Sequence, residues 1–114
     1  MKIEEYTDVA KKPVDVDGAK GVEIRWLISK DDGAANFAMR MFEVQPGGHT
    51  PLHRHPFEHG VFVLDGQGVL VYEGGEHKFS QGYVVFVPAD KEHRFRNTGS
   101  SPLRFLCLVP MSAT

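Results

Sequence analysis

The chain has 114 residues, of which 41% are hydrophobic and 25% are charged, and its formal net charge is −2. This length and composition indicate one ordinary globular domain, and without a basic stripe we expect no nucleic-acid partner. A single cysteine excludes an intrachain disulfide. No run approaches the roughly 20 apolar residues that span a bilayer, and the first residues lack the apolar core of a signal peptide. We therefore expect a cytoplasmic protein that does not contact membranes.

The first 20 residues are mixed and polar, and Pro13 and Gly18 interrupt them. This composition predicts an N-terminal arm, residues 1–20, that belongs to the same domain as residues 21–114. The arm has room for one strand and no more.

The rest of the chain consists of short runs rich in β-branched and aromatic residues, bounded by glycine, proline or aspartate. No segment keeps a 3.6-residue apolar period over three turns, so we expect no helix. Asp65-Gly66 and Gly74-Gly75 are dipeptides typical of tight hairpins. Frequent short strands predict an all-β sandwich or barrel. The predicted strands cover residues 22–29, 36–44, 59–64, 69–72, 77–79, 83–87, 92–97 and 103–109.

Four of the six histidines form the most informative pattern, namely His53, His55, His59 and His93. Side chains two apart in a strand share a face, so an extended chain from His53 to His59 points three imidazoles the same way. Imidazoles that converge without an acid suit a borderline divalent metal. We therefore predict that these four residues bind one divalent transition metal, which is Mn, Fe, Ni, Cu or Zn.

The spacing of these residues resembles two motifs of the cupin family. The first family motif runs Gly, five residues, His-x-His, three or four residues, Glu, six residues, Gly. The second runs Gly, five residues, Pro-x-Gly, two residues, His, three residues, Asn. The corresponding residues here are Gly47, His53, His55, His59 and Gly66, and then Gly82, Pro88, Asp90, His93 and Asn97. The resemblance implies a single jelly-roll barrel, the cupin double-stranded β-helix.

The chain departs from the family motifs at two positions. His59 stands where the family has a glutamate ligand, and Asp90 replaces a glycine in a turn that aspartate tolerates. Strand parity places the neighbouring Glu58 on the opposite face, so the resemblance implies the small single-domain subgroup with an all-histidine site. Neutral imidazoles leave the metal its full charge and make it a stronger Lewis acid. An octahedral site then keeps two open positions, whereas a tetrahedral zinc site is closed and structural.

Two further residues are candidates for the pocket. Cys107 shares strand parity with Phe105 and is either a small buried hydrophobe or a pocket-lining thiol that faces the metal. Arg40 lies within an apolar strand, and we expect its charge to reach water or to pair with an acid rather than to bind an anionic substrate.

Three functions are compatible with this pattern. The first is a metal-dependent oxidative enzyme, dioxygenase-like, that acts on a small organic substrate. The second is a non-catalytic module that binds a metal or a small ligand. The third is a metal-assisted isomerase or lyase for a sugar or oxo-acid, which the lack of a spare general base counts against. We also expect a homodimer, because a barrel this small leaves unpaired strand edges, and we expect the arm (residues 1–20) and the strand beginning at Val22 to pair across its two-fold axis.

Overall fold

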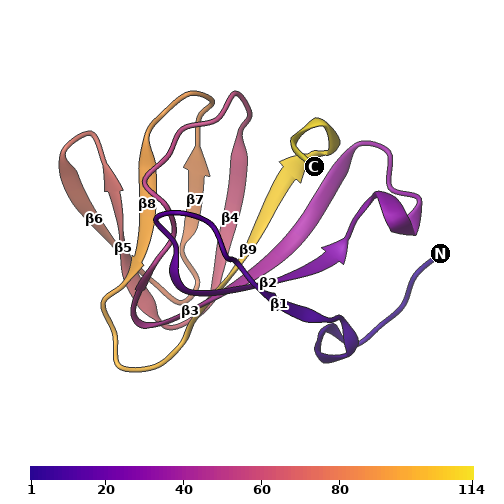
Figure 1. Cartoon of the computed structure of the whole chain (residues 1–114), viewed down its shortest axis with the longest axis horizontal. Coiled ribbons are helices and arrows are strands. Elements are labelled where there is room, and N and C mark those ends of the chain that lie inside the picture. Colours follow the sequence, from indigo (N-terminus) through magenta and orange to yellow (C-terminus); the bar gives the residue numbers. More distant parts are fainter.

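The computed structural model describes residues 1–114 and consists almost entirely of β-strands (Figure 1). The only helices are three single 3-10 turns, η1 (Tyr6–Asp8), η2 (Lys30–Asp32) and η3 (Met111–Ala113). None of them has the length and apolar character needed to cross a membrane. The strands are β1 (Lys11–Pro13), β2 (Lys20–Ile28), β3 (Phe37–His49), β4 (His59–Asp65), β5 (Gln67–Tyr72), β6 (Gly75–Ser80), β7 (Val84–Val87), β8 (His93–Asn97) and β9 (Leu103–Pro110).

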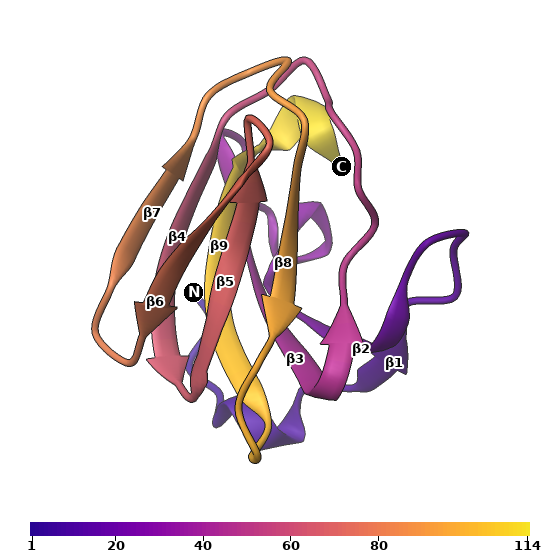
Figure 2. The same ribbon diagram turned by 90° about the vertical axis from the view of Figure 1, so that its left-hand side faces the viewer.

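The strands form one curled antiparallel sheet whose order is β6-β5-β8-β3-β9-β4-β7, with β2 on β3 and β1 on β2. The long strand β3 belongs to both halves, because it pairs with β9 along most of its length and with β8 only through His49 and Arg96. Seen from a second direction, the strands β6, β5 and β8 lie in front of β9 and β3 (Figure 2). This arrangement is the expected all-β jelly-roll barrel.

The core lies between the two halves of the sheet. Buried residues alternate along β9, and β9 pairs with β3 so that Leu103 lies opposite Val44; both are 0% exposed. From β8, Phe95 stacks on Phe105 of β9 with ring centroids 4.8 Å apart. Each fully buried side chain of this kind stabilises the fold by roughly 1.5–3 kcal/mol. The register with β9 therefore places Ala38, Phe42 and Val44 on the face of β3 toward the core. Met41, on the other face, is also buried.

The strand predicted over residues 36–44 is longer in the structure and continues to His49. Val22 pairs with Val44 while Lys20 pairs with His49, so the residues between Val44 and His49 bulge out of the ladder. A Cβ atom on Gly48 would lie 2.5 Å from the carbonyl oxygen of Lys20. The glycines thus permit a bulge within the strand where the sequence predicted a break.

One of the two predicted hairpins is present. A hairpin joins β5 to β6 as expected, but its turn lies one residue earlier than the Gly74-Gly75 dipeptide predicted, because Gly75 already pairs with Tyr72. The two turn residues are Glu73 and Gly74, whose positive φ angles (51° and 73°) match the turn that two-residue hairpins favour. The Asp65-Gly66 hairpin is wrong, because β4 pairs with β7 and β9 whereas β5 pairs with β6 and β8. Gly66 is instead the corner at which the chain crosses between the halves of the sheet.

The N-terminal arm lies along β2. Strand β1 pairs with β2, and the Arg25 guanidinium donates hydrogen bonds to the carbonyl oxygens of Tyr6, Thr7 and Val9. The division of the domain at residue 20 stays a prediction.

Candidate metal centre

The two histidine-bearing segments are joined by main-chain hydrogen bonds. The His53 amide donates to the His93 carbonyl oxygen (3.1 Å), and the His93 amide donates to that of His53 (3.0 Å). A third bond runs from the Asp90 amide to the His55 carbonyl oxygen (2.8 Å). His53 pairs with His93 in a single antiparallel β-bridge and not in a strand, and the chain from His53 to residue 58 is irregular. The expectation of an extended chain is therefore wrong, and these cross-links align the imidazoles.

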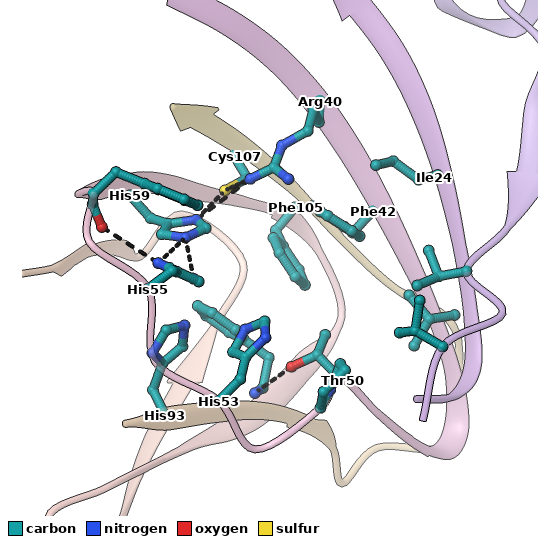
Figure 3. A pocket seen from close by; sticks show the side chains of 16 residues that line it. Ile24, Arg40, Phe42, Thr50, His53, His55, His59, His93, Phe105 and Cys107 are labelled. Carbon is teal, nitrogen blue, oxygen red and sulfur yellow. Dashed lines mark hydrogen bonds between the residues drawn. The ribbon is translucent and has the colours of Figure 1, made fainter. Parts of the chain in front are cut away.

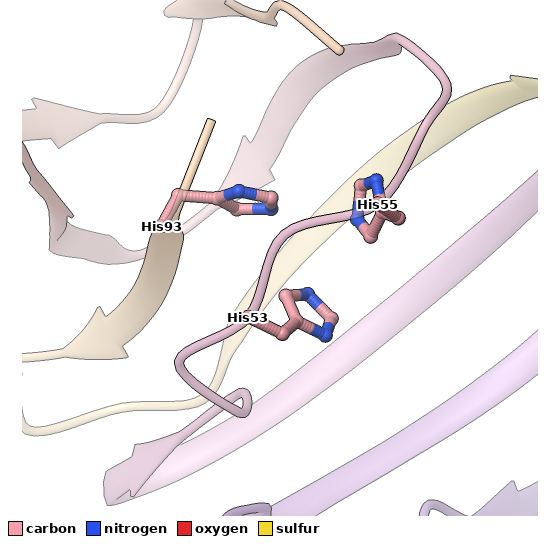
Figure 4. A group of neighbouring side chains, drawn as sticks. All are labelled: His53, His55 and His93. Carbon is pink, nitrogen blue, oxygen red and sulfur yellow. The ribbon is translucent and has the colours of Figure 1, made fainter. Parts of the chain in front are cut away.

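The structure brings three of the four predicted ligands into one group. Potential ligand atoms of His53, His55 and His93 all lie within 4.8 Å of one another, and the three rings face a common space (Figure 4). His59, the first residue of β4, lies beside this group with its Nε2 atom 2.6 Å from the His55 Nε2 atom. Its Nδ1 atom contacts the Cys107 Sγ atom at 2.8 Å. The complete four-histidine set stays a prediction.

The departures from the family motifs have local explanations. Glu58 is exposed while the adjacent His59 is buried, as opposite faces of a strand require. Asp90 has a φ angle of 61°, the left-handed conformation that aspartate adopts more readily than most residues. Neither substitution disturbs the segment that presents the histidines.

Hydrogen bonds at Nδ1 orient the imidazole rings. The Nδ1 atom of His93 lies 2.7 Å from the Lys91 carbonyl oxygen, and that of His55 lies 3.3 Å from the Phe57 carbonyl oxygen. A carbonyl oxygen can only accept, so each Nδ1 carries the proton and each Nε2 keeps its lone pair. The Nε2 lone pair of His55 faces the His59 Nε2 atom at 2.6 Å. This carbonyl–imidazole arrangement is what holds histidine ligands in metal sites.

The environment disfavours the charged form of His53, His55 and His59. Burial lowers the pKa of His53 to about 4 and that of His59 to about 3, and it also lowers the pKa of His55. The positive charge of Arg40 adds to the effect in each case. Metal binding requires neutral imidazole. A cluster of neutral ring nitrogens with no acid among them fits a divalent transition metal.

A cavity of about 260 Å³ opens beside the histidines (Figure 3). No aspartate or glutamate lines it. Sequence reasoning missed the contribution of the N-terminal arm, because nothing in the sequence links Val14 or Val16 to a site 40 residues away. The lining residues are Val14, Val16, Val22, Ile24, Arg40, Phe42, Thr50, Pro51, His53, His55, Phe57, His59, His93, Phe95, Phe105 and Cys107.

Cys107 lies on β9 at the wall of this cavity and is 2% exposed. Burial raises the pKa of its thiol, so the group is protonated and contacts His59 as a neutral partner. The side chain is therefore both a packed core residue and part of the cavity wall.

The structure corrects one half of the expectation for Arg40. Its half-buried side chain pairs with no acid; it extends along the cavity wall, where its Nη2 atom lies 3.1 Å from the Cys107 Sγ atom. Its guanidinium carbon lies 5.5 Å from the Trp26 ring centroid and 5.0 Å from that of Phe42. Strand β3 turns this position inward, beside Cys107 in register.

Three known proteins are similar to the chain over most of its length. The polyketide cyclase RemF from Streptomyces resistomycificus has a structure that superposes with a TM-score of 0.92 at 37% identity, covering 97% of this chain and 80% of that one. An oxalate-binding protein from Thermotoga maritima is 33% identical over 97 residues, which are 81% of this chain and 78% of that protein. The 1-methylthio-D-xylulose 5-phosphate methylsulfurylase of Rhodospirillum rubrum is 38% identical over 71 residues, 62% of this chain.

The matched region is 46% of the length of the Rhodospirillum protein, so the chain spans less than half of that relative. The names of the three relatives describe a cyclase, a binding protein and a methylsulfurylase, which are different activities on one scaffold.

A family model also matches the chain directly. The cupin domain model covers residues 40–109, a range that includes both histidine segments and most of the barrel. The match takes in more than half of the chain, and the chain belongs to the cupin family.

Proposed function

We propose that the protein is a metal-dependent enzyme that holds one divalent transition metal through His53, His55, His59 and His93 and oxidises a small organic substrate in a dioxygenase-like reaction. The observation that supports this proposal is the cluster of neutral imidazoles at the wall of a largely apolar cavity. A metal bound there supplies Lewis-acid and redox chemistry. Iron and manganese are the metals that fit this proposal best.

The side chains around the cluster favour oxidative chemistry over proton transfer. Besides the histidines, the cavity wall contains only Arg40, Thr50 and Cys107 as polar side chains. None of these is a general base near neutral pH, because an arginine stays protonated and burial raises the pKa of the Cys107 thiol. The apolar walls exclude water from the substrate, which strengthens electrostatic interactions inside the cavity. An isomerase or lyase needs a base that these residues do not supply.

A non-catalytic ligand-binding module is the second candidate. The relative from Thermotoga maritima is named an oxalate-binding protein, and it matches 81% of this chain. In that case the metal and the cavity bind a small molecule without converting it. Turnover of a substrate distinguishes the two functions.

The decisive experiment is elemental analysis of protein purified without an affinity resin or added metal. We expect about one equivalent of iron or manganese per chain, together with oxygen uptake that depends on an added organic substrate. Full occupancy by zinc with no open coordination position would favour a structural site. A protein that binds no divalent metal when it is supplied would contradict the proposal.

Single substitutions test the ligand set. His59→Gln is expected to lower metal content as strongly as His93→Gln, because each removes one imidazole from the site. His77→Gln is the matched control, since His77 lies exposed on β6 away from the cavity. Undiminished metal content in His59→Gln would reduce the site to the three histidines that the structure groups together.

We also propose a homodimer of a cytoplasmic protein. Strand β7 has a neighbour only on its β4 side, and its outward residues Val84 and Phe86 are 75% and 61% exposed. A second copy covers such an edge. Sedimentation at micromolar concentration should give a dimer that Phe86→Glu converts to a monomer, while Ile3→Glu in the arm does not. A wild-type monomer would exclude the dimer, and loss of the dimer in Ile3→Glu alone would place the interface on the arm.

A further inference from the structure

The cavity contains one positive side chain and no negative one. Arg40 takes part in none of the ion pairs of the chain, and its Nε atom is buried without a hydrogen-bond partner. Its Nη2 atom contacts only the Cys107 Sγ atom (3.1 Å) and the His59 Nδ1 atom (3.4 Å). Both partners are uncharged, so nothing in the chain balances the guanidinium.

Arg25 offers a comparison within this fold, because its Nε atom is likewise buried without a hydrogen-bond partner while its Nη1 atom has good acceptors. Arg25, on the opposite face of the same sheet, is held by the carbonyl oxygens of Tyr6, Thr7 and Val9. Arg40 has no such carbonyl partners. Withdrawing even part of a cation from water is unfavourable unless an anion or good acceptors replace the water. The imbalance at Arg40 therefore points to an anion that enters the cavity.

We propose that Arg40 binds the carboxylate of a small organic substrate whose apolar part rests against the cavity wall. The planar guanidinium matches the two oxygens of a carboxylate. It lies near the Phe42 ring (Figure 3) and the Trp26 ring, and these aromatic contacts hold it in place. The wall that receives the apolar part is formed by Val22, Ile24 and Phe105. A phosphate dianion needs more donors than one guanidinium and the Thr50 hydroxyl supply.

The location of Arg40 connects this binding site to the metal site. Its guanidinium touches His59, so a carboxylate bound to Arg40 lies next to the histidine cluster. Neutral imidazoles leave the charge of a divalent cation uncompensated, and the cavity then carries a larger positive charge. The substrate carboxylate thus balances positive charge at both Arg40 and the metal. Because this assignment rests on the proposed function, its test must also work in the absence of metal.

The test uses benzoate and butyrate as probes, with benzamide and butyramide as their neutral counterparts. Each is titrated into metal-free and zinc-loaded protein, and binding is followed through the ¹⁵N resonance of the Arg40 Nε atom and by calorimetry. We expect the carboxylates to shift this resonance in both forms and to bind about tenfold or more tightly than the amides, as a charge-assisted bond requires. Zinc should strengthen carboxylate binding.

Two substitutions with the same charge change separate a local from a general effect. Arg40→Met should weaken benzoate binding about tenfold or more. Arg40→Lys keeps the positive charge but loses the planar pair of N–H donors, so its benzoate affinity should lie between those of the wild type and Arg40→Met. Arg96→Met removes a positive charge on β8 that pairs with Glu76, so it should bind benzoate like the wild type. Circular dichroism and thermal unfolding check that each variant is folded. The ¹⁵N signal of Arg40 in the wild type tests carboxylate binding even if a variant fails to fold.

Each result supports or overturns the assignment. Carboxylate binding to metal-free protein, in a chain that takes up no metal, would leave the Arg40 site intact and remove the proposed enzyme. Metal uptake with no response of the Arg40 resonance to either carboxylate would overturn the Arg40 site and leave the proposed metal-dependent enzyme intact. The assignment of Arg40 would also be overturned if benzoate and benzamide bound equally tightly. The same holds if Arg40→Met bound benzoate as tightly as the wild type. Displacement of benzoate by inorganic phosphate of equal affinity would assign the site to phosphate instead.

Discussion

Mild acid is expected to destabilise the metal-free protein through its cavity histidines. The folded state holds the pKa of His53 at about 4 and that of His59 at about 3, whereas the ordinary value is 6.5. As the pH falls below 6.5, the unfolded chain gains protons that the folded chain does not accept. The stabilising contribution is therefore complete above pH 6.5 and is lost as the pH falls toward the folded-state pKa values.

The size of the effect follows from the same shifts. A pKa difference between the folded and unfolded states is worth about 1.4 kcal/mol per unit. Lowering the pH from 6.5, the ordinary histidine pKa, to 5 therefore reduces the free energy of unfolding by at most about 2 kcal/mol for each ring. Solvent screens both rings in part, and His53 is the more exposed of the two. Screening reduces the expected loss for the pair to roughly 2 kcal/mol in total.

Urea unfolding of chelator-treated protein at pH 7 and pH 5 measures this loss. His53→Asn and His59→Asn should each show a smaller loss between the two pH values than the wild type. His77→Asn removes an exposed histidine outside the cavity and should behave like the wild type. Equal unfolding free energies of the wild type at pH 7 and pH 5 would refute the reasoning, as would a loss of pH dependence in His77→Asn.

Four further substitutions test local packing and hydrogen bonding. Gly66→Ala and Gly33→Ala place a side chain at the same φ of 87°, but only at Gly66 does the Cβ atom meet a carbonyl oxygen, that of Pro102 at 2.8 Å. In urea unfolding, Gly33→Ala should lower the free energy of unfolding by about 1 kcal/mol, and Gly66→Ala should lower it by at least about 1 kcal/mol more. Equal losses in the two variants would exclude the clash at Gly66. Asn97→Ala removes three hydrogen bonds to the main chain and should cost about 2–4 kcal/mol; a loss below 1 kcal/mol would show them to be dispensable. Cys107→Ala should leave the metal content unchanged while it enlarges the cavity, and reduced metal content would make the thiol part of the metal site.

The sequence predicted those features that depend on neighbours along the chain. His53 and His55 lie two residues apart, and that spacing is local. His93 joins them through main-chain bonds between distant segments, and only the resemblance to the family motifs placed it in the site. The hairpin near Gly74-Gly75 was predictable from local sequence, because a two-residue turn determines the register of its own strands. Short-range spacing of this kind is readable without a structure.

Features that depend on pairing between distant segments could not be predicted. Asp65-Gly66 has the composition of a hairpin, yet β4 pairs with β7 and β9, whose positions no local signal specifies. The charge environment of Arg40 likewise depends on β2 and β9, which meet β3 only in the folded sheet. An arginine in an apolar strand is usually paired, and only the packed cavity shows that this one is not.

The two proposed ligands of the cavity, a metal and a carboxylate, cannot bind independently. Both act on the same small volume, which contains a guanidinium, neutral imidazoles and no acid. A divalent cation raises the positive potential that attracts the carboxylate, and the carboxylate lowers the repulsion that Arg40 exerts on the cation. Linkage requires that zinc strengthen benzoate binding by the same factor by which benzoate strengthens zinc binding. In Arg40→Met, zinc should bind more tightly without benzoate, because the repulsion is gone, while benzoate is held by the metal alone. A cavity in which the metal binds equally well with and without Arg40 would mean that the guanidinium and the metal site do not interact.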